Sequence, residues 1–218
     1  MRKIKFVNGE FYHICNRGVD KRKIFGNQYD IQRFSQSMEE FNTINPIGSL
    51  YESSFLNDKI RAKRKAKRLV NFIAYCLNPN HYHLILEQLI ENGISQFMHR
   101  LNGGYTWYFN KKYQRSGSLF QGRFKATHID SNEYLLHVSA YVNLNFKIHQ
   151  LGGSAAKLVK SSWEEYADDQ KLGLCKKNII LDQFNSVKEY KAFVLETLPA
   201  LINKKELDRE LAVLLLES

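Results

Sequence analysis

The most regular part of the chain covers residues 69–88 and reads LVNFIAYCLNPNHYHLILEQ. The apolar run over residues 69–76 predicts a buried strand, and the Asn-Pro-Asn sequence at 78–80 has the composition of a turn. Residues 81–88 again suit a strand, rich in apolar side chains. We therefore expect an antiparallel hairpin with a somewhat long loop.

The segments on either side of this hairpin predict further strands and helices. They are a strand over 10–16, a helix around residues 31–41, a helix over 94–113, a short extended stretch over 118–127 and a helix from Ser131 to about Gln150. The order is strand, helix, strand, strand, helix, helix, which favours an α+β fold with helices on one face of an antiparallel sheet. A ferredoxin-like sheet is the nearest familiar arrangement.

The chain is expected to divide into two parts near residue 150. Gly152-Gly153-Ser154 has the composition of a linker. Residues 1–150 would form the main domain, and residues 151–218 a helical C-terminal extension with helices over 161–170, 187–195 and 205–215. Residues 44–68 are polar and irregular, and resemble an insertion between core elements.

Positive charge is concentrated before residue 150. The 218 residues carry 32 Lys+Arg against 22 Asp+Glu, and residues 151–218 are close to neutral. A basic region next to a neutral one indicates a polyanionic partner, with nucleic acid as the default. Residues 61–68, RAKRKAKR, contain six of these cations. They could be a solvated helical face or a strip that contacts phosphates.

Several classes of protein are excluded by composition. The longest apolar stretch, 69–77, is interrupted by Asn71 and is far shorter than the ~20 residues of a membrane span. No hydrophobic run follows the N-terminal Met-Arg-Lys, so we expect no signal peptide. Cys15, Cys76 and Cys175 are odd in number and widely spaced, as in a reduced, cytoplasmic protein without disulfides or a zinc site.

Two local patterns could carry chemistry. His81 and His83 lie two residues apart in a strand, so their side chains share a face and could bind one cation at about 2.1 Å. An HxH pair can equally be two hydrogen-bonded histidines. Tyr141 and Asn145 are four residues apart and would share a face of the last predicted helix, although Tyr141 also suits a core stripe.

Residues 117–125, GSLFQGRFK, interleave basic and aromatic side chains around two glycines. This composition suits contacts to backbone phosphates and stacked bases. An ordinary hairpin with two exposed cations would have the same sequence.

Together these segments resemble the REP-associated tyrosine transposases, within the single-tyrosine HUH transposase superfamily of insertion sequences. The resemblance runs in order from about residue 8 to residue 190. Its segments are YHICNRG at 12–18, AYCLNPNHYHL at 74–84, YTWYFN at 105–110, GSLFQGRFK at 117–125, AYVNLN at 140–145 and SSWEEY at 161–166. Phe146 stands where many relatives have proline, and the 44–68 insertion is longer than usual.

The resemblance implies a metal-dependent nicking and strand-transfer enzyme. His81, His83 and Asn145 would be the ligands of a divalent ion, Mg²⁺ or Mn²⁺, and Tyr141 the nucleophile that forms a 5′-phosphotyrosine. The substrate would be single-stranded or hairpin DNA, with candidate contacts from Arg17, Arg115, Arg123 and Lys125. No membrane partner is expected, and either a monomer or a homodimer fits.

Two other functions are compatible with these residues. A domesticated DNA-hairpin binder would keep the basic face and lose the cleavage chemistry. A metal-dependent phosphodiesterase would use water as the nucleophile, with Tyr141 only structural. Replacing Tyr141 with phenylalanine distinguishes these possibilities.

Overall fold

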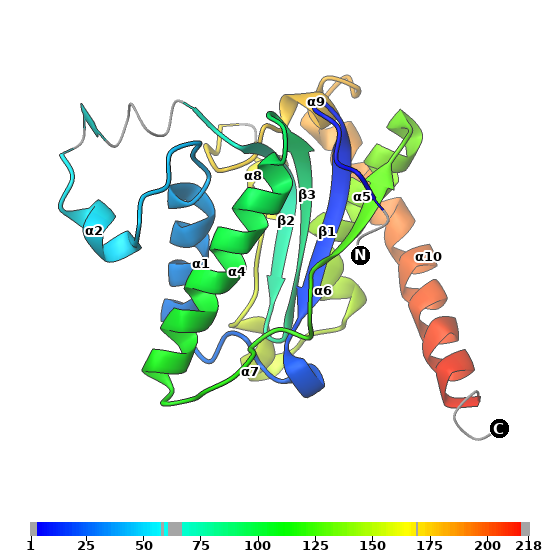
Figure 1. Cartoon of the computed structure of the whole chain (residues 1–218). Helices are drawn as coiled ribbons and strands as arrows, with labels where there is room; N and C mark the ends of the chain where they lie inside the picture. Colours follow the sequence, from blue (N-terminus) through cyan, green and yellow to red (C-terminus); the bar gives the residue numbers. More distant parts are fainter. Residues whose placement is uncertain (1–3, 58, 61–66, 169, 215–218) are drawn as a thin grey trace.

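The computed structural model describes residues 4–57, 59–60, 67–168 and 170–214. Its centre is a five-stranded antiparallel sheet with the order β4-β1-β3-β2-β5 (Figure 1). The strands are β1 (Phe11–Arg17), β2 (Val70–Asn78), β3 (His81–Gln88), β4 (Lys125–Ile129) and β5 (Lys160–Ser161). The first four strands have the ferredoxin-like order, with helices after β1 and after β3. The predicted α+β class is confirmed.

Strands β2 and β3 form the predicted hairpin, with Asn78 paired to His81 across a turn at residues 79–80. Side chains of β3 alternate between the two faces of the sheet. Tyr82 and Leu84 enter one hydrophobic core, whereas His81 and His83 face the other side. The alternation that stabilises the sheet therefore also brings the two imidazoles to one face.

Helices cover both faces of the sheet, in contrast to the expectation of helices on one face. Helices α1 (Gln28–Glu40) and α4 (Gly93–Lys112) lie on one side in Figure 1, and α5 (Asn132–Asn143), α6 (Asn145–Ile148) and α10 (Val187–Leu214) lie on the other. The reason is that β2 is apolar on both sides. Its residues Phe72 and Leu77 belong to the first core, and Ile73 and Cys76 to the second.

Shorter helices connect these layers. They are η1 (Val19–Lys21), α2 (Leu50–Ser54), α7 (Gly153–Ala156), α8 (Trp163–Ala167) and α9 (Asn178–Leu181). Helix α2 lies inside the predicted insertion. The insertion also contains the basic strip at 61–68, of which residues 61–66 lie outside the described residues.

The C-terminal extension packs directly on the sheet. Strand β5 pairs with β2, and the Tyr166 hydroxyl donates to the Ile73 carbonyl at 2.6 Å. Helix α10 is continuous where two helices were predicted, and it contains Pro199. Proline removes one backbone N–H donor and its ring crowds the carbonyl four residues earlier, yet α10 continues through Pro199. The division into 1–150 and 151–218 stays a prediction.

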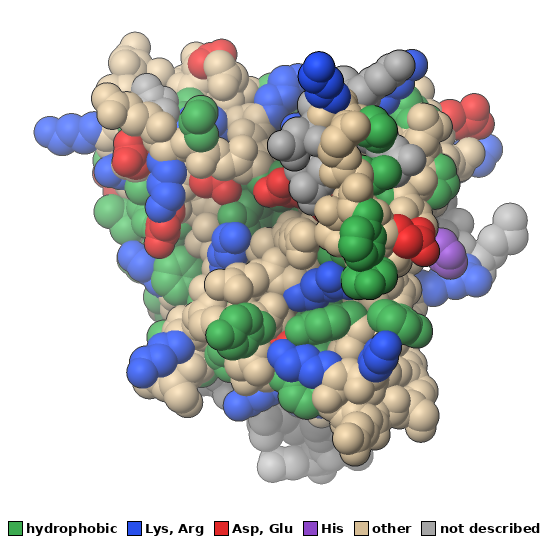
Figure 2. All heavy atoms as spheres, turned by 90° about the vertical axis from the view of Figure 1, so that its left-hand side faces the viewer, with side chains coloured by type: hydrophobic (Ala, Val, Ile, Leu, Met, Phe, Trp, Pro, Cys, Tyr) green, Lys and Arg blue, Asp and Glu red, His purple; other side chains and the backbone are tan. Residues whose placement is uncertain are grey.

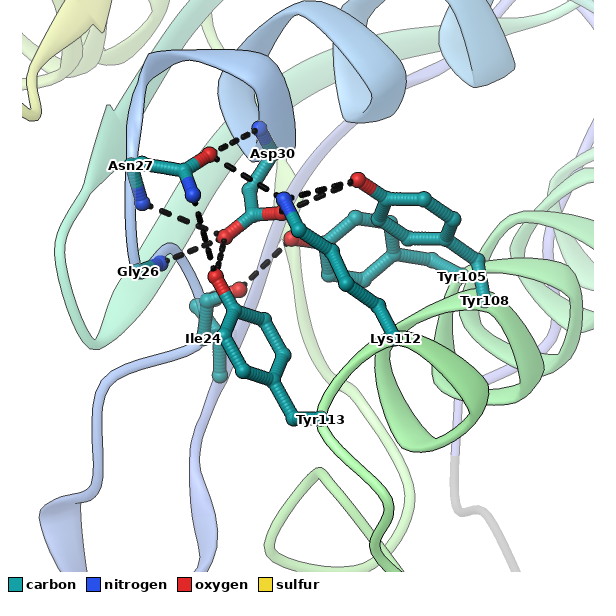
Figure 3. Close-up of polar contacts among 8 residues, drawn as sticks. All are labelled: Ile24, Gly26, Asn27, Asp30, Tyr105, Tyr108, Lys112 and Tyr113. Atoms are coloured by element: carbon teal, nitrogen blue, oxygen red, sulfur yellow. Dashed lines mark hydrogen bonds and ion pairs between the residues drawn. The ribbon is translucent and has the colours of Figure 1, made fainter.

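The start of α1 is tied to the end of α4 by a buried carboxylate, Asp30 (Figure 3). Its oxygens accept hydrogen bonds from Lys112 Nζ at 2.6 Å, Tyr113 at 2.7 Å and Tyr108 at 3.0 Å. They also accept from the backbone N–H of Gly26 at 2.7 Å. Burial alone would raise the pKa of Asp30, but these hydrogen bonds hold it below its ordinary value. Asp30 is thus charged and fully partnered inside the fold.

The outer face of α1 and α4 carries cations against aromatic rings. In Figure 2 the lower part of this face shows Lys and Arg side chains between apolar ones. Lys111 lies 5.0 Å from the Trp107 ring centroid, and Lys112 lies 5.2 Å from that of Tyr113. These cations are therefore held by cation–π contacts on the far side of the sheet from His81 and His83.

None of the described helices is both long and apolar enough to cross a bilayer. The three cysteines are free thiols, as predicted.

Candidate active site

Three neighbouring strands bring polar side chains to the face that carries the imidazoles. His83 on β3 is opposite Cys15 on β1, and His81 is opposite Arg17. On the other neighbour, β2, Asn78 is opposite His81. Residues opposite each other in antiparallel strands point to the same side of the sheet, so these five side chains form one polar surface at the end of the sheet.

Tyr141, on helix α5, lies next to this surface. The first turn of the helix is capped by Ser131, whose hydroxyl accepts from the backbone N–H of Tyr134. The half-buried Tyr141 ring stands edge-on to two imidazoles, with centroids 5.4 Å from His83 and 5.9 Å from His13. Burial raises the pKa of the Tyr141 phenol, and the neighbouring Asn145 side chain opposes this shift. The phenol is therefore protonated at neutral pH.

Asn145 lies next to Tyr141. The prediction placed both residues on one helix, but they lie on two. The helix is interrupted at Leu144, so Asn145 begins α6. Its side chain is fully buried, and its Oδ1 accepts from Asn78 Nδ2 at 2.7 Å and lies 3.2 Å from His81 Nε2. Its Nδ2 is one of the buried polar atoms without a hydrogen-bond partner among the described residues.

The His81 and His83 rings are each held by a hydrogen bond at Nδ1. His81 Nδ1 is 2.7 Å from Asn80 Oδ1, and His83 Nδ1 is 2.8 Å from His13 Nε2. Burial lowers the pKa of His13 to about 4 and lowers the pKa of His83 well below its ordinary value. Burial is also the main cause of the lowered pKa of His81. All three rings are neutral at pH 7, which is the form that binds metals.

The donor atoms fit a divalent cation. When Nδ1 of His81 donates to Asn80, Nε2 is an acceptor, and it lies 3.2 Å from Oδ1 of Asn145. Cis ligands of an octahedral ion at about 2.1 Å are about 3.0 Å apart, so this spacing suits such an ion. Asn78 Nδ2 lies 2.9 Å from Nε2 and donates to Oδ1 at 2.7 Å, so a bound ion would take the place of these two hydrogen bonds. Within the described residues no group of three or more His, Cys, Asp or Glu side chains could hold a metal, so the set depends on the Asn145 amide.

A cleft of about 790 Å³ opens beside His81 and His83. Three of the predicted DNA contacts, Arg17, Arg123 and Lys125, line it. No Asp or Glu is among the described residues that line it, which are Cys15, Asn16, Arg17, Lys21, Asn80, His81, His83, Gln121, Arg123, Lys125, His149 and Lys205. A cleft lined by one sign of charge concentrates the opposite sign, so this one suits a polyanion.

Residues 117–125, which follow α4, contribute side chains to both the cleft and the core. Gln121 is bound to Arg17 through its backbone N–H at 2.8 Å and its side chain at 2.5 Å. The aromatic residue Phe120 is buried in the first core, and Phe124 packs against that core. The cations of the predicted basic–aromatic stretch thus reach the cleft, while its aromatic rings stabilise the fold.

Arg115 is not at the cleft. Its guanidinium is bound to Asn110 Oδ1 at 2.9 Å and lies over the Phe109 ring at 5.8 Å. We expect Arg115→Ala to leave the affinity for single-stranded DNA within about twofold, and Arg123→Ala to lower the salt slope of binding by about 0.7. Fluorescence anisotropy at several salt concentrations measures both. An equal effect of the two substitutions would contradict this placement.

Sequence reasoning missed His13 and Asn78 as site residues. His13 could have been found, because it alternates with Cys15 and Arg17 along the predicted strand and must share their face. Asn78 was interpreted only as a turn residue. Its contact with Asn145 joins residues 67 positions apart, for which the sequence carries no local signal.

Comparison with known proteins gives one match to a family. Residues 51–145 match the model of the IS200-like transposases. A solved structure of a REP-associated tyrosine transposase bound to a REP hairpin is similar at a TM-score of 0.48 and 13% identity, covering 81% of this chain and 96% of that chain. No curated protein matches. The matched segment contains His81, His83, Tyr141 and Asn145, and the match confirms the predicted resemblance to transposases.

Proposed function

We propose that the protein is a metal-dependent endonuclease and strand transferase that acts on single-stranded, hairpin-forming DNA through a phosphotyrosine intermediate. The observation that carries the proposal is the placement of Tyr141 edge-on to His83, 5.4 Å between ring centroids, beside a cleft rich in cations. A nucleophile, candidate metal ligands and a polyanion site thus meet within one chain.

The residues His81, His83 and Asn145 would hold the ion. Imidazole and amide ligands are compatible with Mg²⁺ or Mn²⁺. When bound, the ion polarises the scissile phosphate and stabilises the charge that develops on it. The neutral state of both imidazoles and the hydrogen bond from His81 Nδ1 to Asn80 Oδ1 support this role, because they leave Nε2 of His81 as an acceptor.

Tyr141 would perform the displacement. Its Oη forms a bond to phosphorus as the bond from phosphorus to the 3′ oxygen breaks, leaving a 5′-phosphotyrosine and a free 3′-OH. The phenolic proton is lost to a base and the 3′ oxygen gains one. Because the phosphoester is conserved in the covalent link, attack by a new 3′-OH rejoins the strand without ATP.

The cations of the cleft would bind the strand. Arg17, Arg123 and Lys125 line it from β1, the loop before β4 and β4 itself. Contacts to phosphates are independent of sequence and sensitive to salt. Single-stranded DNA suits such a site because its backbone can follow the cleft without the constraint of a duplex.

Covalent trapping tests this function. The full chain is incubated with Mn²⁺ or Mg²⁺ and a labelled library of DNA hairpins with randomised single-stranded flanks, then denatured and separated by electrophoresis. We expect an adduct that survives denaturation and disappears with a chelator. DNA binding without any adduct across the library would favour the non-cleaving binder.

Metal binding can be measured apart from cleavage. We expect His81→Ala and Asn145→Ala each to weaken Mn²⁺ binding by at least about tenfold in isothermal titration calorimetry, because each removes one ligand. His128→Ala is the matched control, since His128 is exposed on β4 and bonded to Glu10. Unchanged Mn²⁺ affinity in His81→Ala would show that the ion lies elsewhere.

A further inference from the structure

The C-terminal helix α10 reaches the cleft, although all of it follows the family-matched segment. Lys205 lines the cleft, and its Nζ donates to the carbonyl of Ile148 at 3.1 Å. Ile148 is the last residue of α6, the helix that begins with Asn145. One cation of the cleft therefore comes from the extension.

The position of Lys205 is determined by contacts at both ends of α10. Near its start, the buried Tyr190 hydroxyl accepts from Asn143 Nδ2 of α5 at 2.8 Å. Near Lys205, Gln150 Nε2 donates to Glu206 at 3.2 Å. These contacts hold α10 against α5 and α6, so the ammonium group does not depend on a flexible tail for its place.

A second imidazole of the cleft, His149, lies beside His81. His149 stacks obliquely on His81, with ring centroids 4.6 Å apart, and it also lines the cleft. The charge of Lys205 contributes to the lowered pKa of His81, after burial. The ammonium group is thus within electrostatic range of a proposed metal ligand that also lines the cleft.

We infer that Lys205 and His149 form a phosphate subsite next to His81, which binds a phosphodiester of the DNA strand in the cleft. The inference rests on the proposed function and adds a contact from the C-terminal extension. The ammonium group supplies the charge, the Ile148 carbonyl orients it, and the His149 imidazole lines the same cleft. A role confined to capping the end of α6 predicts different results in the experiment below.

The experiment measures binding of a mixed-sequence single-stranded oligonucleotide to the full chain in the presence of a chelator. Phosphate contacts do not depend on sequence, so no cognate site is required. Fluorescence anisotropy at several salt concentrations gives the affinity and its salt slope. The variants are Lys205→Met, Lys205→Arg and Lys204→Met, the last removing an equal charge from an exposed neighbour on the same helix. Thermal unfolding of each variant reports the docking of α10.

We expect Lys205→Met to weaken binding roughly fivefold at low salt and to reduce the salt slope by about 0.7, the value for one phosphate contact on a single strand. Lys205→Arg should restore the slope, and Lys204→Met should match the wild type. An unchanged slope in Lys205→Met, or an equal loss in Lys204→Met, would overturn the subsite while leaving the proposed function intact. If the wild-type chain binds no DNA, the proposed function fails and the subsite fails with it.

Discussion

Tyr141→Phe is expected to abolish the covalent DNA adduct and to lower strand cleavage by at least about 10³-fold. The substitution keeps the ring that packs against His83 and His13 and removes only the hydroxyl. Binding of the same DNA should stay within about twofold of the wild type, because the cations of the cleft are unchanged. Gel separation after denaturation measures the adduct, and fluorescence anisotropy measures binding.

Tyr134→Phe is the matched control, since Tyr134 is on the same helix and 39% exposed. It should form the adduct at the wild-type rate. Cleavage without an adduct that survives in Tyr141→Phe would instead identify a phosphodiesterase that uses water. An adduct that persists in Tyr141→Phe would assign the nucleophile to another residue.

Asp30→Ala is expected to lower the free energy of unfolding by about 3 kcal/mol. The carboxylate is fully buried and accepts from Lys112, Tyr113 and Tyr108, as well as from the start of α1. Its removal leaves these donors unsatisfied and breaks the capping box with Asn27. Urea unfolding at pH 7 measures the change.

The same carboxylate gives the stability a defined pH dependence. Because folding lowers the pKa of Asp30, the unfolded state binds the proton more readily, and stability falls as the pH drops below about 4. Asp30→Asn should flatten that acid-side decrease. Asp182→Ala is the control, because Asp182 is exposed at the end of α9 with ordinary helical backbone angles; it should change stability by less than about 0.5 kcal/mol. An equal loss in both alanine variants would contradict a special role for Asp30.

The hairpin and the face that its histidines share could be predicted from sequence. Residues 81–88 form the predicted strand with the same bounds, because its apolar side chains and the preceding turn are local signals. His81 and His83 share a face because successive side chains of a strand point to opposite faces. Their proximity to Tyr141 could be expected only from the family resemblance.

The rest of the site depends on contacts between distant segments. The bond between His13 and His83 joins residues 70 positions apart, and it follows from strand register, which a single sequence does not encode locally. The break at Leu144 also escaped prediction, because residues 131–150 have no proline or glycine to mark it. Arg115 had the right charge for a DNA contact, but it folds back over Phe109 near the end of α4, a local conformation that its charge does not reveal.

Side chains of β1 alternate between the two faces of the sheet, and this alternation limits how the length of the strand can change. Tyr12 and Ile14 belong to the core on one side, while His13, Cys15 and Arg17 lie on the side of the cleft or the imidazoles. Insertion or deletion of one residue in β1 would exchange the two sets, placing a guanidinium in the core and apolar side chains at the cleft. We therefore expect homologous proteins to differ in this strand by substitution, and to confine changes of length to its two ends.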